Sequence, residues 1–158
     1  MSLVDYLDEC QPQVIVETGC LYRTYGTFAE DDGWSTLHIA KWCELHPNTA
    51  FHSVDIEQSH IDVARAKLYK DGVHFEPIFH CGDSVYVLKH IIGPVDFAYL
   101  DSCDGYLHGL EEFNEVVRLG AKMVVMDDYI GKGVWAAEHA KNADWDVKQE
   151  ERYTVIRR

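Results

Sequence analysis

The sequence has few basic residues. Its 158 residues include 14 lysines and arginines against 27 aspartates and glutamates, which gives a formal net charge of −13. Proteins bind nucleic acids by neutralising phosphates with lysine and arginine, so this composition argues against a nucleic-acid partner. It also argues against binding to an anionic membrane surface, which attracts basic segments. A small molecule, a cation or a basic partner is compatible with the charge.

Paired cysteines and long apolar runs are also missing. The five cysteines are odd in number and never spaced as C-x-x-C, which argues against a zinc site or a disulfide framework and favours a reducing compartment. No apolar run approaches the roughly 18–20 residues of a membrane span. The first residues lack the basic and apolar stretches of a signal peptide. We therefore expect a cytoplasmic protein, away from membranes, with one domain over residues 1–158.

Two glycine-rich nucleotide-binding signatures do not occur. The sequence contains neither G-x-G-x-x-G nor G-x-x-x-x-G-K-[ST]. In dinucleotide-binding and P-loop proteins these glycines allow the backbone to approach the phosphates, so both classes lose their main support. A nicotinamide oxidoreductase is kept only as a disfavoured alternative, which titration with NADH would test.

Four short apolar runs, in contrast, each end on an acidic residue. These residues are Glu17, Asp55, Asp101 and the pair Asp127–Asp128, and helix-length stretches separate the runs. Short, β-rich apolar runs at such spacing predict buried parallel strands. The carboxyl ends of parallel strands lie at one edge of an open α/β sheet, where these folds bind their ligands. The acids therefore predict a site at that edge.

The order of the elements predicts an α/β fold with three layers, in which helices cover both faces of a Rossmann-like sheet. The predicted strands are residues 13–17, 50–55, 75–80, 95–100 and 122–126, followed by an antiparallel C-terminal hairpin of 145–148 with 153–157. The predicted helices are residues 2–9, 35–45, 59–70, 85–91, 109–119 and 134–140. Residues 20–33 are predicted to form a loop that orders over a bound cofactor.

The junction between the first strand and the following helix is a candidate cofactor cradle. Gly19 allows a tight turn and a close backbone approach. The helix that begins near Ser35 and Thr36 offers unpaired N–H groups to a carboxylate or phosphate. Asp55, at the end of the second strand, can accept hydrogen bonds from both hydroxyls of a ribose. The alternative for Asp55 is a turn or helix-capping residue.

Taken in order, several motifs resemble those of a known family. They are Glu17-Thr18-Gly19 with Gly33-x-Ser35-Thr36, Val54-Asp55, Gly82-Asp83-Ser84, Leu100-Asp101 through Gly105-Tyr106, and Met126-Asp127-Asp128-Tyr129. This set is similar to the class I S-adenosyl-L-methionine (SAM)-dependent methyltransferases, above all to small-molecule O-methyltransferases related to the macrocin and catechol enzymes. The resemblance spans residues 14–129 and implies a methyltransferase sheet, mostly parallel, whose last strand is antiparallel.

The resemblance also implies a role for each matching position. Glu17 and Gly19 would line the methionine end of SAM, and Ser35 and Thr36 would bind its carboxylate. The remaining cofactor-binding residues would be Asp55 at the ribose, its neighbour Ile56, Asp83 with Ser84 beside the adenine, and Asp101 between the cofactor and a metal site. Two features depart from the family: residues 20–32 exceed the usual glycine-rich turn, and the lid of many relatives is missing.

Asp101, Asp127 and Asp128 form a predicted metal site. In the metal-dependent O-methyltransferases that this chain resembles, acids at these positions hold a divalent cation, and oxygen ligands suit Mg²⁺. Three unneutralised carboxylates in close proximity would oppose folding, whereas a cation or a cationic group removes that penalty. The alternative is that Asp101 contacts the cofactor while Asp127 and Asp128 cap a loop.

The general base is predicted at Asp104, together with Asp101 as a second catalytic residue. Asp104 stands where relatives often carry histidine or lysine. An aspartate is an adequate base if the acceptor hydroxyl is a phenol or an enol, or if Mg²⁺ acidifies it. A turn residue before Gly105 is the alternative for Asp104. Cys103 and His108 are lesser candidates for the base.

These residues together predict a SAM-dependent methyltransferase that methylates the hydroxyl of a small-molecule acceptor, with Mg²⁺ assisting. Sugars, polyketide glycosides and catechol-like acceptors all stay open. A non-catalytic module that binds SAM or another nucleoside is the alternative. A homodimer is also possible, because a second subunit could cover the site that a lid covers elsewhere.

Overall fold

The computed structural model describes residues 1–21, 34–90, 93–103, 105–127, 131–150 and 152–158. Most of the predicted loop 20–33 lies outside these ranges, as do Asp104 and Asp128. Within the described ranges, no helix combines the length and the apolar character that crossing a membrane requires.

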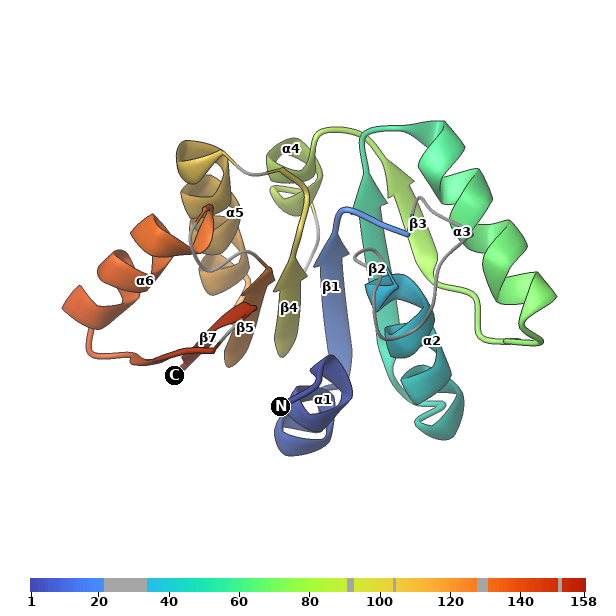
Figure 1. Ribbon diagram of the computed structural model, residues 1–158, viewed down its shortest axis with the longest axis horizontal. Helices are drawn as coiled ribbons and strands as arrows, with labels where there is room; N and C mark the ends of the chain where they lie inside the picture. The colour runs from blue at the N-terminus through green and yellow to red at the C-terminus, as the bar shows by residue number, and fades with distance from the viewer. Residues whose placement is uncertain (22–33, 91–92, 104, 128–130, 151) are drawn as a thin grey trace.

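A seven-stranded sheet forms the middle layer, in the order β3-β2-β1-β4-β5-β7-β6 (Figure 1). The strands are β1 (Val14–Thr18), β2 (Ala50–Asp55), β3 (Ile78–Cys81), β4 (Phe97–Leu100), β5 (Met123–Asp127), β6 (Asp146–Gln149) and β7 (Tyr153–Arg157). Strands β1 to β5 run parallel, and β7 pairs antiparallel with both β5 and β6. This arrangement confirms the predicted mostly parallel sheet with an antiparallel hairpin.

Helices cover both faces of the sheet, as predicted. One face carries α1 (Leu3–Cys10), α2 (Ser35–Leu45) and α3 (Gln58–Lys70), and the other carries α4 (Ser84–Leu88), α5 (Tyr106–Arg118) and α6 (Gly133–Asn142). In Figure 1, α1 and α2 lie on the side of the sheet that faces the viewer. Each face has its own apolar cluster, so the sheet is buried between two cores.

Local sequence explains several element boundaries. All residues of β4 and β5 are buried, as expected for central parallel strands that are covered on both faces. Helix α1 begins with a capping box, in which the Ser2 hydroxyl accepts a hydrogen bond from the Asp5 N–H. The Asp5 carboxylate in turn accepts one from the Ser2 N–H, so two of the unpaired donors at the helix start are satisfied.

Most elements begin one to three residues away from the predicted start, and three of these differences are informative. Strand β3 starts at Ile78 and not at residue 75, because Pro77 has no N–H to donate to a sheet ladder. Helix α4 starts at Ser84, because Asp83 caps it by accepting a 2.8 Å hydrogen bond from the Tyr86 N–H. Helix α5 starts three residues early, at Tyr106, and therefore includes Gly109 in its interior.

Candidate functional site

The carboxyl ends of β1, β2, β4 and β5 lie along one edge of the sheet. In the sheet register, Thr18 stands beside Val54 and Leu100, and Leu100 stands beside Met126. The residues that directly follow these four are Gly19, Asp55, Asp101 and Asp127. The structure therefore places the predicted glycine and three of the predicted acids at one edge, where open α/β sheets bind ligands.

A cavity of about 210 Å³ lies at this edge. Five of the residues predicted to bind a cofactor line it: Gly19, Asp55, Ile56, Asp83 and Ser84. They come from the ends of three different strands and the start of α4, so only the fold brings them together. The exposed Ile56 side chain offers an apolar surface next to the Asp55 carboxylate.

Gly19 permits the closest backbone approach in this site. Its φ of +81° is in the left-handed region, which side chains rarely adopt. A Cβ atom on this residue would lie 2.7 Å from the carbonyl carbon of Asp101 and 3.0 Å from the Cα of Ser102. The turn after β1 therefore packs directly against the turn after β4, and only glycine fits between them.

The Asp55 carboxylate is held by the residues around it. Its Oδ2 accepts a hydrogen bond of 3.0 Å from the Cys20 N–H, and its Oδ1 accepts one of 2.8 Å from the Glu57 N–H. The His60 Nδ1 lies 3.0 Å from Oδ1. These contacts fix the carboxylate at the wall of the cavity, and Oδ2 can accept a second hydrogen bond.

Glu17 and Thr36, which were also predicted to contact the cofactor, lie in the interior of the protein. Glu17 is fully buried, and its Oε2 accepts hydrogen bonds of 2.8 Å from the Thr36 hydroxyl and 2.6 Å from the Ser53 hydroxyl. Burial raises the pKa of Glu17 to about 7, although the nearby hydroxyls lower it in part. Neither Glu17 nor Thr36 lines the 210 Å³ cavity. Together they link β1, β2 and the start of α2, and their predicted contact with a cofactor stays a prediction.

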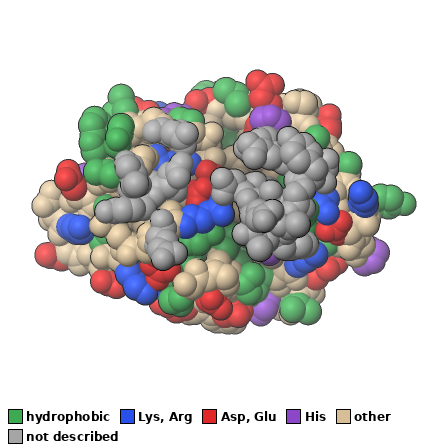
Figure 2. All heavy atoms as spheres, in the orientation of Figure 1, with side chains coloured by type: hydrophobic (Ala, Val, Ile, Leu, Met, Phe, Trp, Pro, Cys, Tyr) green, Lys and Arg blue, Asp and Glu red, His purple; other side chains and the backbone are tan. Residues whose placement is uncertain are grey.

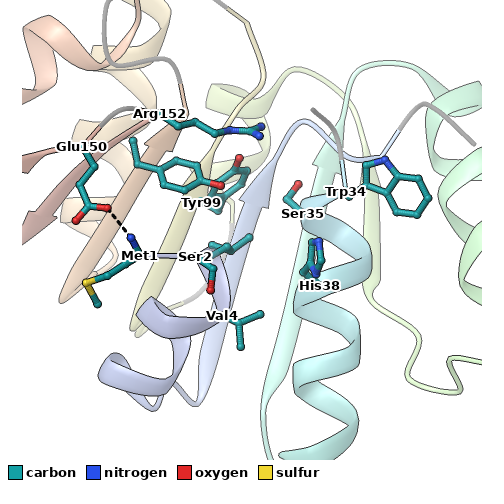
Figure 3. Close-up of a pocket in the computed structure, with 11 residues that line it drawn as sticks. Met1, Ser2, Val4, Trp34, Ser35, His38, Tyr99, Glu150 and Arg152 are labelled. Carbon is teal, nitrogen blue, oxygen red and sulfur yellow. Dashed lines mark hydrogen bonds and ion pairs between the residues drawn. The ribbon is translucent and has the colours of Figure 1, made fainter. Parts of the chain in front are cut away.

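A second, larger cavity of about 580 Å³ adjoins the sheet. Its polar and aromatic wall is made by Trp34, Ser35, His38, Tyr99, Arg152 and Tyr153. Figure 3 shows Trp34, Ser35 and His38 on one side, at α2, and Tyr99 and Arg152 on the other. Ser35 thus lies at this larger cavity and not at the smaller one.

The two described acids of the predicted metal site both carry a cationic partner. The Lys132 ammonium lies 2.7 Å from Asp101 Oδ1, and Arg152 binds both oxygens of Asp127, at 2.7 Å and 3.3 Å. Burial raises the pKa of Asp101 to about 6, and the Lys132 charge opposes that rise. Figure 2, in the orientation of Figure 1, shows acidic and basic side chains side by side near the middle of the face that is turned to the viewer.

Sequence reasoning missed Lys132 and Arg152. Lys132 directly precedes α6, and Arg152 directly precedes β7, so both lie at element boundaries without a periodic pattern. The signal that could have found them is charge: a buried and a half-buried acid in a chain of net charge −13 need cations from its few basic residues.

The lesser candidates for a base line the smaller cavity. Both Cys103 and His108 contribute to its wall. His108 Nε2 lies 2.8 Å from the Ser84 hydroxyl and 3.5 Å from the buried Glu112, whose proximity raises the pKa of His108. Cys103 and His108 therefore lie next to the predicted adenine position. Asp104 lies outside the described residues.

No protein-family model and no curated protein sequence matches this chain. Solved structures do match its fold. The O-methyltransferase TomG from Streptomyces achromogenes, in complex with SAM, is 18% identical with a TM-score of 0.70, over 96% of this chain and 75% of TomG. An O-methyltransferase from Bacillus cereus, in complex with S-adenosyl-L-homocysteine (SAH), is 14% identical with a TM-score of 0.68. The match covers 100% of this chain and 82% of that one.

A third solved structure that matches this fold is a putative O-methyltransferase from Klebsiella pneumoniae. It is 17% identical, with a TM-score of 0.73, over 98% of this chain and 77% of that one. Likeness at such low identity is a likeness of fold, and a fold alone does not determine a reaction. Sheet order, helix placement and these neighbours agree: the chain has the fold of the class I SAM-dependent methyltransferases.

Proposed function

We propose that this protein is a SAM-dependent methyltransferase that methylates a hydroxyl of a small molecule. The observation that carries the proposal is the 210 Å³ cavity. Five residues chosen from the sequence as cofactor contacts line this one cavity, in a fold that the SAM complex of TomG and the SAH complex of the Bacillus cereus enzyme share.

The described residues suit the parts of this cofactor. The fixed Asp55 carboxylate would accept hydrogen bonds from the ribose hydroxyls, and charged acceptors make strong hydrogen bonds. Ile56 would cover the apolar face of the adenine, beside Asp83 and Ser84. SAM supplies a methyl group that its sulfonium already activates. The protein's main contribution is therefore to hold the acceptor oxygen in line with that methyl group.

In this proposal Asp101 receives the proton of the acceptor. Its Oδ1 is engaged by Lys132, whereas its Oδ2 makes no hydrogen bond within the described residues. The side chain is 21% exposed, so a hydroxyl can reach it from the site. As the acceptor oxygen bonds to the methyl carbon and the carbon–sulfur bond breaks, the hydroxyl proton would pass to Asp101. A pKa of about 6 suits this step best for a phenol or an enol.

The 580 Å³ cavity is the proposed acceptor site. Tyr99 immediately precedes Leu100 and Asp101 in the chain, and Arg152 joins the cavity wall to Asp127. The rings of Trp34, Tyr99 and Tyr153 give this wall an aromatic surface, which favours a flat or aromatic acceptor by stacking. Among the acceptors left open by the sequence, a catechol-like molecule fits this wall best.

The described residues, as they lie, do not fit a Mg²⁺ site. Asp101 and Asp127 would each have to give up a cationic partner before they could bind a metal ion. Among the described residues, no three His, Cys, Asp or Glu side chains are grouped to hold a metal ion, and Asp128 lies outside them. No step of the proposed reaction is therefore assigned to a metal.

Substitution of Asp55 tests the cofactor site. Calorimetric titration with SAH should show saturable binding to the wild-type protein, and Asp55→Ala should weaken it roughly 10- to 100-fold, because one charged hydrogen-bond acceptor contributes about 1.5–3 kcal/mol. Asp62→Ala, an exposed position on α3, is the matched control and should bind like the wild type.

The same titration separates the alternatives. If the folded wild-type protein shows neither binding nor a rise in melting temperature with millimolar SAH, the proposed function is wrong, since any ligand of the native state must stabilise it. If SAH binds but a panel of phenols, catechols and sugars gives no methylated product with SAM, the non-catalytic binding module is the better description.

A further inference from the structure

Lys132 is among the largest fully buried side chains of the described residues. It immediately precedes α6, and its side chain is 1% exposed. Lysine is almost never fully buried unless its charge is paired, because removing an ammonium from water costs several kcal/mol. The pairing partner that the structure shows is Asp101, at 2.7 Å.

Helix α5 leaves room for this lysine. A Cβ atom on Gly109 would lie 2.8 Å from the Cβ of Lys132 and 3.1 Å from its carbonyl oxygen. Any larger residue at position 109 would therefore push Lys132 away from the end of β4. The helix interior carries a glycine here, which costs roughly 1 kcal/mol against alanine, and the close packing of Lys132 accounts for it.

Arg152 completes a second pair on the neighbouring strand. It binds both oxygens of Asp127, the bidentate geometry in which arginine holds a carboxylate most firmly. A divalent cation between Asp101 and Asp127 would meet two positive side chains already in contact with the same oxygens. Side chains of the chain itself thus balance the charges of these two acids.

We propose that the Lys132 ammonium and the Arg152 guanidinium take the place of a divalent metal ion, so that this site works with cations that are part of the chain. Lys132 acts as a positioning residue. It binds Asp101 Oδ1 and so fixes the carboxylate, while Oδ2 is left to accept the proton of the acceptor. This inference rests on the proposed function for its reaction, but its first test does not require catalysis or an acceptor.

The test measures binding of Mn²⁺, as a spectroscopic substitute for Mg²⁺, to the full chain by electron paramagnetic resonance. The wild-type protein should show no saturable binding up to about 1 mM, because both acids are engaged. The double variant Lys132→Met, Arg152→Met frees the two carboxylates and should gain at least roughly a tenfold tighter affinity for Mn²⁺, since carboxylate oxygens suit this metal. Adding Asp101→Asn to that variant should remove the gain.

Replacing a lysine that only packs against α5, without neutralising Asp101, would not produce a metal site, so the gain of binding separates these two roles. Lys141→Met, at an exposed position of α6, is the matched control and should bind no metal. Melting curves with and without Mn²⁺ show whether each variant is folded. In a destabilised but folded double variant, Mn²⁺ should raise the melting temperature.

The proposal would be overturned if the wild-type protein bound Mn²⁺ or Mg²⁺ saturably below about 1 mM and Asp101→Asn abolished that binding. This result needs no destabilised variant. A folded double variant that gains no Mn²⁺ affinity would overturn it as well. The proposed function is tested separately by SAH. If the wild-type protein binds neither SAH nor metal, the methyltransferase assignment fails while the charge balance of the site stands.

Discussion

Gly19→Ala is expected to destabilise the protein strongly and to abolish cofactor binding. The new Cβ would sit 2.7 Å from the carbonyl carbon of Asp101, a backbone atom that cannot move without displacing the end of β4. The left-handed φ of +81° adds about 1–2 kcal/mol for a residue with a side chain. Overpacking adds about 1–3 kcal/mol, so we expect the free energy of unfolding to fall by roughly 2–5 kcal/mol in total.

Gly72→Ala is the matched control for this experiment. Gly72 also has a positive φ, of +71°, but a Cβ atom there would meet nothing within 4 Å. The control should therefore lose only the backbone part, about 1–2 kcal/mol, and keep its SAH affinity. Urea denaturation of both variants measures the difference. Equal losses for the two glycines would mean that the turn after β1 is not tightly packed against the turn after β4.

The Glu17→Gln variant is expected to gain stability relative to the wild type as pH rises. Burial raises the pKa of Glu17 from 4.5 to about 7 in the folded protein, so between these values the folded state binds more protons than the unfolded state. The wild type therefore loses stability as pH rises through this window, by roughly 3 kcal/mol in total. Glutamine keeps an acceptor for the hydroxyls of Thr36 and Ser53 but cannot ionise, so the variant escapes this loss.

Urea denaturation at pH 4.5, 6 and 8 measures the effect. The difference in unfolding free energy between variant and wild type should shift toward the variant as pH increases. Glu111→Gln, at an exposed position on α5, should show no such shift. A constant difference across the three pH values would show that Glu17 has no raised pKa in the folded state.

Much of the fold could be predicted because buried parallel strands appear in the sequence as short apolar runs. Strand β2, Ala50–Asp55, has the predicted bounds, since an apolar run between Asn48 and an acidic end leaves little choice of limits. The third strand was predicted to begin too early, at residue 75. The apolar pattern around Pro77 resembles a strand, but proline has no N–H to donate to a sheet. Helix α5 was predicted too short, because Gly109 looked like a helix start and is in fact a packing position for Lys132.

The site could be predicted where it depends on strand ends, and not where it depends on distant loops. Asp55 is the last residue of β2 and Gly19 directly follows β1, so parallel pairing brings them together. Arg152, by contrast, stands 25 residues from Asp127, and only the antiparallel return of β7 brings it there. The sequence argument for Mg²⁺ required a cation or a cationic group beside the acids. The structure supplies two cationic side chains, and metal binding itself stays a prediction.

The position of β7 has a consequence for how the chain folds as it is synthesised. This strand lies between β5 and β6 in the sheet, yet it follows both in the chain. On the ribosome, the outer edge of β5 therefore stays open until residues 153–157 have emerged, and β6 has no partner until then. An unpaired apolar strand edge invites association with other chains. The nascent protein thus exposes an aggregation-prone edge until β7 has emerged and paired with β5.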